Sequence, residues 1–296
     1  MSGASVRTDL PSRAQVVIIG GGVIGTSVAY HLAKLGWTDV VLLERDQLTS
    51  GTTWHAAGLI VSGGMTTETL AWMTKYSTDL YAALERETGL STGFKPVGYL
   101  QTASNPDRMH KLRREADFLR LMGIEREEVS PREVAELWPH VDPRGVLGGF
   151  FTASEGRADP YNVAMSLAAG ARARGVRIVQ GAPVVGIEHD AGRVTGVVTE
   201  QGTIHAERVV NCAGMWARQV GAMAGVSVPL QAIEHAYLIT EPIEGVSPDL
   251  PIFEDPDRFA YYREETGGLM VGLFEPVAAP WSTRSEEHTS ELQSLT

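Results

Sequence analysis

A glycine pattern near the N-terminus, G-x-G-x-x-G, separates a continuous apolar run at residues 16–19 from a helical pattern over residues 23–35. The apolar run predicts a strand of a parallel sheet that is buried on both faces. Gly20 permits a tight turn, Gly22 lets the backbone approach a diphosphate, and Gly25 lets helix and strand pack closely. The sequence therefore predicts a βαβ unit that binds a dinucleotide at a helix N-terminus. The alternative is that these glycines only form a turn.

An acidic residue closes the second predicted strand. Glu44 follows the apolar residues 40–43 directly. A carboxylate at this position accepts hydrogen bonds from the hydroxyls of an adenosine ribose, which favours FAD or NAD over NADP.

The segment after that strand distinguishes FAD from NAD. Residues 51–58, GTTWHAAG, are small, polar and glycine-rich where a simple dehydrogenase would begin its next helix. A flavin is longer than its ADP half and needs a segment that follows it, so we expect FAD. A later apolar strand at residues 209–212 ends in Ala213 and Gly214, where a ligand can lie against the carboxyl ends of parallel strands.

Composition excludes several classes of protein. The chain has 296 residues, a formal net charge of −11 and one cysteine, Cys212. The acidic balance argues against a duplex nucleic-acid binder, which needs basic surface. No apolar run approaches the roughly 18 residues that span a bilayer, and residues 1–15 lack the apolar core of a signal peptide. We therefore expect a cytoplasmic protein with neither nucleic acid nor membrane as a partner.

The remaining patterns predict a mixed α/β fold. Helices are expected over 66–87, after Asn105-Pro106, after the Ser130–Glu133 capping box and over 161–174, capped by Asp159. Strands are expected at 97–102, 177–179, 184–188, 194–199, 203–206, 209–211 and 232–240, and in a hairpin of 258–264 with 269–274. We expect a doubly wound, Rossmann-like FAD-binding domain interleaved with a mostly antiparallel α+β substrate domain. The first spans 14–90 and 153–225, and the second spans 91–152 and 226–281.

Five stretches resemble a known family: VVIIGGGVIGTSVAYHLAKLG, LLERD, SGTTWHAAGL, RVVNCAGMW and FAYYRE. They resemble the D-amino-acid-oxidase-type flavoproteins, and most of all the dimethylglycine and sarcosine dehydrogenase or oxidase group. The resemblance covers residues 14–281, and TWHAAG is its most specific part. It implies that His55 carries FAD covalently through the flavin 8α-methyl group. It also implies cofactor contacts from Val23, Ile24, Glu44, Arg45, Thr52, Leu59 and Val184, with Thr53 in the same loop.

The same resemblance implies two active-site positions, His235 and Tyr261. Members of the group continue into a folate-binding C-terminal region, which this chain lacks, so folate is expected as a partner only through such a region. Residues 284–296, RSEEHTSELQSLT, resemble a translated sequencing adapter more than a native segment. We therefore expect a C-terminally truncated chain that folds poorly or binds FAD weakly and turns over no substrate. A native disordered tail is the alternative.

The chemistry of these residues can be argued directly. A neutral imidazole is nucleophilic. The residues alone favour His55 as a hydrogen-bonded polar loop residue, and the family resemblance favours it as the flavin attachment site. Amine oxidation needs an unprotonated nitrogen, and His235 can accept that proton, while Tyr261 can orient the amine or the flavin edge. Tyr262 should face the opposite side of the strand. Arg263 shares the Tyr261 face and is a candidate for the substrate carboxylate, with a packing role as the alternative.

The function we expect is oxidation of an N-methylated glycine, dimethylglycine or sarcosine, by hydride transfer from the N-methyl carbon to flavin N5. The alternatives are a related oxidase of another secondary amine or amino acid, and a non-catalytic, flavoprotein-like regulatory subunit. Cys212 is expected to be a small buried side chain. The other histidines have no mutual spacing typical of a metal site, so no metal is expected.

Overall fold

The computed structural model describes residues 10–281 and begins with the predicted βαβ unit. β1 (Arg13–Ile19) leads into α1 (Val23–Lys34), and β2 (Val40–Leu43) follows beside β1 in parallel. β2 is buried along its whole length, as its apolar sequence predicts. α1 ends at Leu35, and Gly36 takes a φ of +90°, a conformation that favours glycine.

The first sheet has six strands in the order β8-β2-β1-β11-β10-β9. The four adjacent strands β8, β2, β1 and β11 are parallel, and β10 and β9 extend the sheet as an antiparallel meander. The further strands are β8 (Arg177–Val179), β9 (Val184–Asp190), β10 (Arg193–Thr199) and β11 (Gly202–Asn211). The predicted strands 203–206 and 209–211 are therefore one strand, because β11 pairs continuously with β1 from Arg13 to Ile19.

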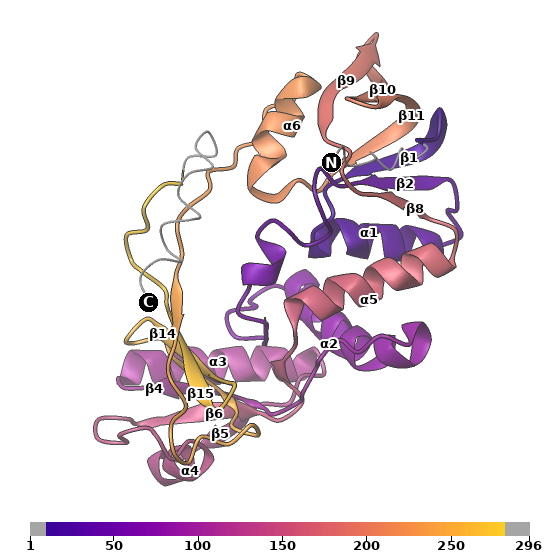
Figure 1. The fold of residues 1–296 in the computed structure, drawn as a ribbon. Helices are drawn as coiled ribbons and strands as arrows, with labels where there is room; N and C mark the ends of the chain where they lie inside the picture. The colour runs from indigo at the N-terminus through magenta and orange to yellow at the C-terminus, as the bar shows by residue number, and fades with distance from the viewer. Residues whose placement is uncertain (1–9, 282–296) are drawn as a thin grey trace.

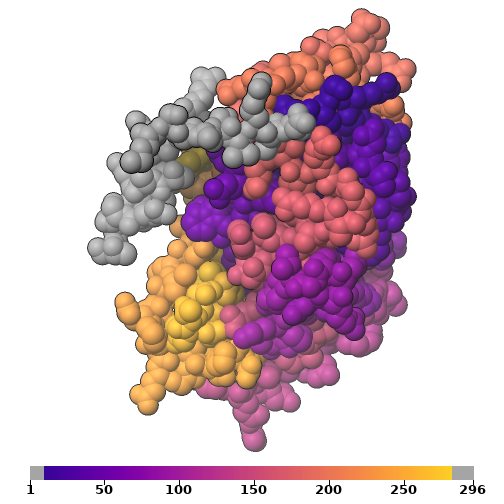
Figure 2. Space-filling model, turned by 45° about the vertical axis from the view of Figure 1, so that its right-hand side comes forward, coloured from indigo at the N-terminus to yellow at the C-terminus, as the bar shows by residue number. Residues whose placement is uncertain are grey.

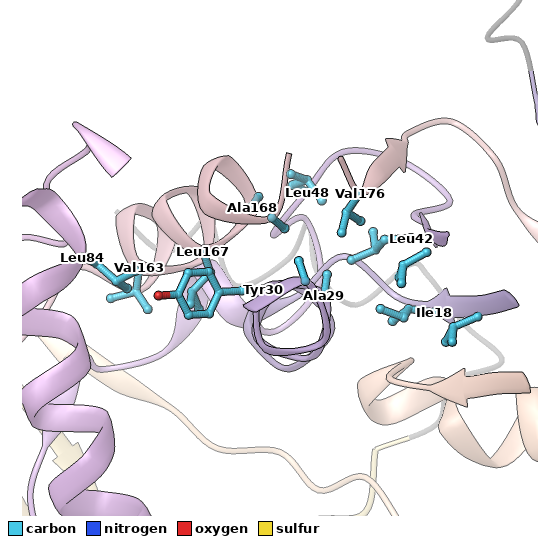
Figure 3. Packing of buried hydrophobic residues seen from close by; sticks show 14 of the residues in the cluster. Ile18, Ala29, Tyr30, Leu42, Leu48, Leu84, Val163, Leu167, Ala168 and Val176 are labelled. Atoms are coloured by element: carbon cyan, nitrogen blue, oxygen red, sulfur yellow. The ribbon is translucent and has the colours of Figure 1, made fainter. Parts of the chain in front are cut away.

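Helices cover one face of this sheet (Figure 1). α1 packs on α5 (Pro160–Ala173), which packs on α2 (Glu68–Thr88). The core between them contains Ile18, Leu42, Leu84 and Leu167, all almost fully buried (Figure 3). Each such side chain contributes about 1.5–3 kcal/mol by leaving water. Asp159 caps α5 by accepting from the Asn162 backbone N–H at 2.9 Å, as predicted.

The second sheet has seven strands in the order β12-β15-β14-β13-β4-β6-β5. All its neighbours are antiparallel except β13 and β4. Its strands are β4 (Tyr99–Ala103), β5 (Glu127–Val129), β6 (Gly148–Thr152), β12 (Tyr237–Ile239), β13 (Ile252–Asp255), β14 (Ala260–Glu265) and β15 (Gly268–Leu273). Two helices accompany it, α3 (Pro106–Leu121) and α4 (Pro131–Leu137), and both begin at the predicted caps.

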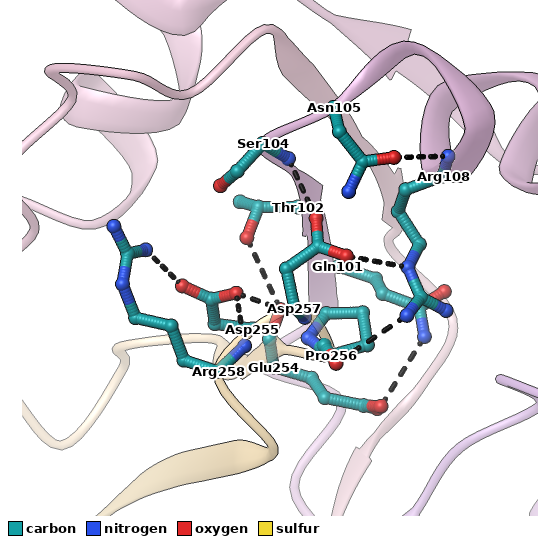
Figure 4. A network of polar contacts seen from close by, with 10 residues as sticks. All are labelled: Gln101, Thr102, Ser104, Asn105, Arg108, Glu254, Asp255, Pro256, Asp257 and Arg258. Atoms are coloured by element: carbon teal, nitrogen blue, oxygen red, sulfur yellow. Dashed lines mark hydrogen bonds and ion pairs between the residues drawn. The ribbon is translucent and has the colours of Figure 1, made fainter.

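This sheet also corrects the sequence prediction. The strand expected over 232–240 is only three residues long, and β5, β6 and β13 were not predicted. β6 is glycine-rich because a Cβ at Gly149 would approach the Gln101 carbonyl oxygen at 2.6 Å. β13 leads into a charged turn whose groups are hydrogen-bonded to distant residues. Figure 4 shows this network, in which the carboxylate of Asp257 accepts from the Ser104 backbone N–H and from Arg108 Nε at 2.8 and 3.0 Å.

Short elements join the two sheets. The 3₁₀ turn η1 (Thr53–His55) leads to β3 (Leu59–Ile60), which pairs with β7 (Gly156–Arg157). The turn η2 (Gly214–Trp216) and α6 (Ala217–Met223) follow β11. In the space-filling view, β9 to β11 and the orange-to-yellow residues near 240–273 lie at opposite ends of the molecule (Figure 2). Within residues 10–281, no helix is both long and apolar enough to cross a membrane. The segment 284–296 lies outside the described residues.

Candidate functional site: a dinucleotide groove facing the second sheet

The predicted glycine loop is a backbone cradle at the carboxyl ends of β1 and β11. Gly20 has a φ of +111°, and a Cβ there would overlap the carbonyl oxygen of Cys212. A Cβ at Gly25 would overlap the carbonyl oxygen of Gly20. Helix, loop and strand therefore approach one another as closely as backbone allows, which is the packing that a diphosphate-binding turn requires.

The start of α1 has free hydrogen-bond donors. Val23 N–H donates to Thr53 Oγ1 at 3.0 Å, and the N-cap residue, Gly22, offers no side chain. Among residues 10–281, no acceptor receives the backbone N–H of Ile24 or Gly25. These donors and the positive end of the helix dipole suit an anionic group. The residues present therefore fit the diphosphate of FAD.

Glu44 closes the other side of the cradle. Its carboxylate accepts from the backbone N–H of Gly21 at 2.7 Å and from that of Asp46 at 3.0 Å. A carboxylate has about four acceptor positions, so two remain for ribose hydroxyls. The Glu44 backbone is fixed as well, since its carbonyl oxygen accepts from Ala182 N–H at 2.9 Å.

The other predicted cofactor residues occupy two places. Arg45 stacks on Trp216, with its guanidinium carbon 4.0 Å from the ring centroid. Val184 begins β9, two residues after Ala182, whose N–H donates to the Glu44 carbonyl oxygen. Ala213 and Gly214 follow the end of β11. Thr52 caps η1, and Leu59 begins β3, so the two lie on the loop that runs from the cradle toward the second sheet.

His55 lies at the end of η1 with its ring tilted against that of Trp54, the ring centroids 3.8 Å apart. Partial burial lowers the pKa of His55 below its ordinary value. The imidazole is therefore mainly neutral and nucleophilic at neutral pH.

A cavity of about 570 Å³ opens where this loop faces the second sheet. Its walls include Trp54 and Ala56 of the loop, Tyr161 at the start of α5, and Tyr237 and Met270 of β12 and β15. Sequence analysis did not identify Tyr237 or Met270. The sequence pattern that could have indicated Tyr237 is weak. Tyr237 and Ile239 are two residues apart on a three-residue apolar strand, so they share a face, and Ile239 also lines the cavity.

The two predicted active-site residues lie together but outside the lining of that cavity. The rings of His235 and Tyr261 have centroids 6.4 Å apart, and Phe274 lies 5.2 Å from Tyr261. Burial raises the pKa of Tyr261, so its hydroxyl stays protonated. Tyr262 faces the other side of the strand, as predicted, where its ring lies 5.8 Å from that of Trp138.

Arg263 does not match its predicted role as a free partner for a substrate carboxylate. Its Nε donates to the Ala57 carbonyl oxygen at 2.6 Å, its Nη1 donates to the Glu264 carbonyl oxygen at 3.0 Å, and its Nη2 pairs with Glu265 at 2.6 Å. All three nitrogens are engaged, so the packing alternative describes this residue. Cys212 is half-buried, and this burial raises its pKa to about 11, so the thiol is unreactive at neutral pH.

Residues 15–295 match the family described as FAD dependent oxidoreductase (DAO). The chain belongs to this family. The expected flavoprotein resemblance and the predicted mixed α/β fold are thus confirmed. A crystal structure of L-proline dehydrogenase from P. horikoshii has a TM-score of 0.84 and 27% identity, covering 96% of this chain and 76% of that one.

Three curated relatives resemble nearly the whole chain. Sarcosine dehydrogenase, mitochondrial, from Homo sapiens is 42% identical and covers 94% of this chain. 4-Methylaminobutanoate oxidase (formaldehyde-forming) from Paenarthrobacter nicotinovorans is 38% identical over 94% of it. Pyruvate dehydrogenase phosphatase regulatory subunit, mitochondrial, from Mus musculus is 39% identical over 97%. The matches cover 31%, 34% and 33% of these proteins, so the chain spans about a third of their length. Within the described part of the chain, no group of three or more His, Cys, Asp or Glu side chains is arranged to hold a metal ion.

Proposed function

We propose that this protein oxidises an N-methylated glycine, dimethylglycine or sarcosine, with FAD bound in the groove between the cradle and the second sheet. The observation that carries the proposal is the continuity of the site. A backbone cradle at α1 leads through the His55 loop to a cavity lined by Tyr237 of β12 and Arg263 of β14. Two of the three relatives are named for methylated amines.

The two sheets have different roles in this function. In this proposal the first sheet and the helices α1 and α5 form the FAD domain, over 14–90 and 153–225. The second sheet forms the substrate domain, over 91–152 and 226–281. When bound, FAD would supply the acceptor for a hydride from the N-methyl carbon, and hydrolysis of the oxidised substrate would release formaldehyde. The chain itself binds the diphosphate at α1, holds ribose hydroxyls at Glu44 and removes the ammonium proton at His235.

We also propose that FAD is attached through His55. The lowered pKa of this histidine keeps the imidazole unprotonated, which is the form that can bond to the flavin 8α carbon. Acid precipitation of the FAD-loaded protein tests this: a yellow pellet is expected, with flavin moving to the supernatant in His55→Ala. The control is His189→Ala, at an exposed histidine of β9. Flavin that is soluble in acid from the unaltered protein would contradict the attachment.

A second candidate is a regulatory, non-catalytic flavoprotein, because a phosphatase regulatory subunit is among the relatives. Anaerobic mixing of the FAD-loaded full natural chain with sarcosine, dimethylglycine and a panel of other secondary amines separates the candidates. Bleaching by the N-methylglycines supports the proposal, and bleaching only by another amine supports a related oxidase. A flavin that no amine reduces favours the regulatory subunit. The cytoplasmic location and the folate partner stay predictions.

A further inference from the structure

The active-site histidine sits in a bulge between two strand pairings. β12 pairs with β15 at one end, and at the other Ile233 forms a bridge with Pro280. Residues 273–279 therefore lie opposite residues 234–236, and the longer side must bend outward between two fixed points. The two connections run beside each other along one edge of the molecule (Figure 1).

The bulge brings His235 and Glu275 together. His235 Nδ1 lies 3.2 Å from a carboxylate oxygen of Glu275, and both side chains are about two-fifths exposed. The neighbouring residue is held in place, since Phe274 N–H donates to the Phe259 carbonyl oxygen at 2.7 Å. The Phe274 ring then stacks on the His235 ring with centroids 5.9 Å apart. Backbone pairing and stacking thus restrict both partners of the contact.

A glycine makes room for the third aromatic ring of this cluster. A Cβ at Gly272 would overlap the ring of Tyr261, so only glycine lets that ring lie across β15 toward Phe274. The charged and titratable groups nearest the cluster are Tyr237, Arg263 and Glu275, each of which acts on Tyr261. Since Arg263 is already paired with Glu265, the carboxylate of Glu275 is the charge that faces the imidazole.

The direction of the His235 hydrogen bond follows from the charge of its partner. The backbone N–H of Glu275 itself and the imidazole hold the pKa of this carboxyl below its ordinary value. An ionised carboxylate only accepts hydrogen bonds, so Nδ1 of His235 must carry the proton. The lone pair of Nε2 is then available to another donor.

We propose that Glu275 is the positioning residue of His235: its carboxylate fixes the Nδ1–H tautomer and leaves Nε2 to take the ammonium proton of the methylated amine. This inference rests on the proposed amine oxidation. In the step, the ammonium N–H bond breaks, its electron pair stays on the substrate nitrogen, and the proton bonds to Nε2. The imidazolium formed is balanced by the adjacent carboxylate.

The same carboxylate orients the substrate. A methylated glycine carries an ammonium and a carboxylate, and the negative charge of Glu275 attracts the first and repels the second. The amine end therefore lies on the side of His235, and the carboxylate end points away from residue 275.

The tautomer can be measured directly. Ring nitrogen NMR on histidine-labelled, FAD-loaded protein is expected to show protonated Nδ1 and bare Nε2 at His235, identified by its loss in His235→Asn. Glu275→Gln keeps an amide oxygen that can accept from Nδ1–H and should retain this tautomer. Glu275→Ala should lose it. The matched control is Glu234→Gln, which removes a carboxylate from the neighbouring residue and should change nothing. Protonated Nε2 in the unaltered protein, or one tautomer in all variants, would overturn the inference.

Rates separate this inference from the proposed function. In the FAD-loaded full natural chain, anaerobic reduction of the flavin by substrate should slow by about ten-fold or more in Glu275→Ala. It should recover in part in Glu275→Asp, with FAD affinity unchanged. If no amine reduces the flavin of the full natural chain, the proposed function fails, and the NMR result still decides whether Glu275 sets the tautomer. If reduction is equally fast in Glu275→Ala, the positioning role is wrong although the function stands.

Discussion

Arg263 Nε donates to the carbonyl oxygen of Ala57 at 2.6 Å, which joins strand β14 of the second sheet to the loop just beyond His55. The guanidinium is buried, and its ion pair with Glu265 lies in the wall of the cavity. The hydrogen bond therefore fixes the distance between the loop that we propose holds the flavin and the sheet that we propose holds the substrate.

Replacing Arg263 with Met should loosen this junction. The variant removes a charged donor from Ala57 and leaves Glu265 without its partner, which should lower the free energy of unfolding by about 2–3 kcal/mol. Urea denaturation measures the change. Arg132→Met is the control, because its ion pair with Glu136 is exposed and should contribute nothing measurable. Equal stability of the two variants would show that the Ala57 contact does not hold the junction.

Arg126→Met should be among the most destabilising single changes. Arg126 and Glu115 form an ion pair 3.2 Å long with side chains that are 0% and 3% exposed. Removing one partner leaves the other buried charge unpaired, which should lower the free energy of unfolding by about 3–5 kcal/mol. Glu115→Gln keeps an acceptor for Gly64 N–H, which donates to this side chain at 2.6 Å. The double variant Arg126→Met/Glu115→Gln should therefore be more stable than Arg126→Met in denaturant titrations. A double variant that is less stable would refute the explanation by an unpaired buried charge.

Gly25→Ala should weaken FAD binding and stability together. The added Cβ would overlap the Gly20 carbonyl oxygen, so α1 must move away from the cradle. Overpacking of this kind costs about 1–3 kcal/mol. Flavin titration and thermal unfolding of the apoprotein measure the two effects. In the control Gly186→Ala, the added Cβ would meet Val198 at an ordinary 3.6 Å, so both quantities should be retained.

Stability should fall as the pH rises through about 10. Burial raises the pKa of Tyr262, with the nearby Asp255 charge adding to it, and burial likewise raises the pKa of Tyr99 and Tyr81. Unfolded tyrosines lose their proton near pH 10. Above that pH the unfolded state binds fewer protons than the folded state, so the free energy of unfolding decreases with pH.

Tyr262→Phe tests this dependence, because phenylalanine keeps the packing contacts of the ring but has no hydroxyl to titrate. The decrease of stability at alkaline pH should therefore be less steep in this variant. Melting temperatures between pH 8 and 11 provide the measurement. Tyr161→Phe, at an exposed ring, serves as the control. An identical alkaline slope in Tyr262→Phe and the unaltered protein would count against a contribution from this residue.

Some features of the fold could be predicted because their causes are local. The buried apolar run of β1, the turn glycines and the caps at Asn105, Ser130 and Asp159 each depend on residues close in sequence. Strands β5, β6 and β13 escaped prediction for the opposite reason. Their glycines and charges are unfavourable in an isolated strand, and β6 and β13 are stabilised by pairing with the distant strand β4, which includes Gln101.

The candidate site divides in the same way. The glycine cradle, Glu44 and the flavin-family resemblance could be recognised from the residues alone, since a diphosphate needs backbone donors and close packing over a short stretch of chain. The contacts of Arg263 with Ala57 and Glu265, and of Glu275 with His235, became known from the folded chain. Both contacts depend on how far-apart segments pair and bulge, and side-chain partners across such pairings are set by three-dimensional register rather than by spacing along the chain.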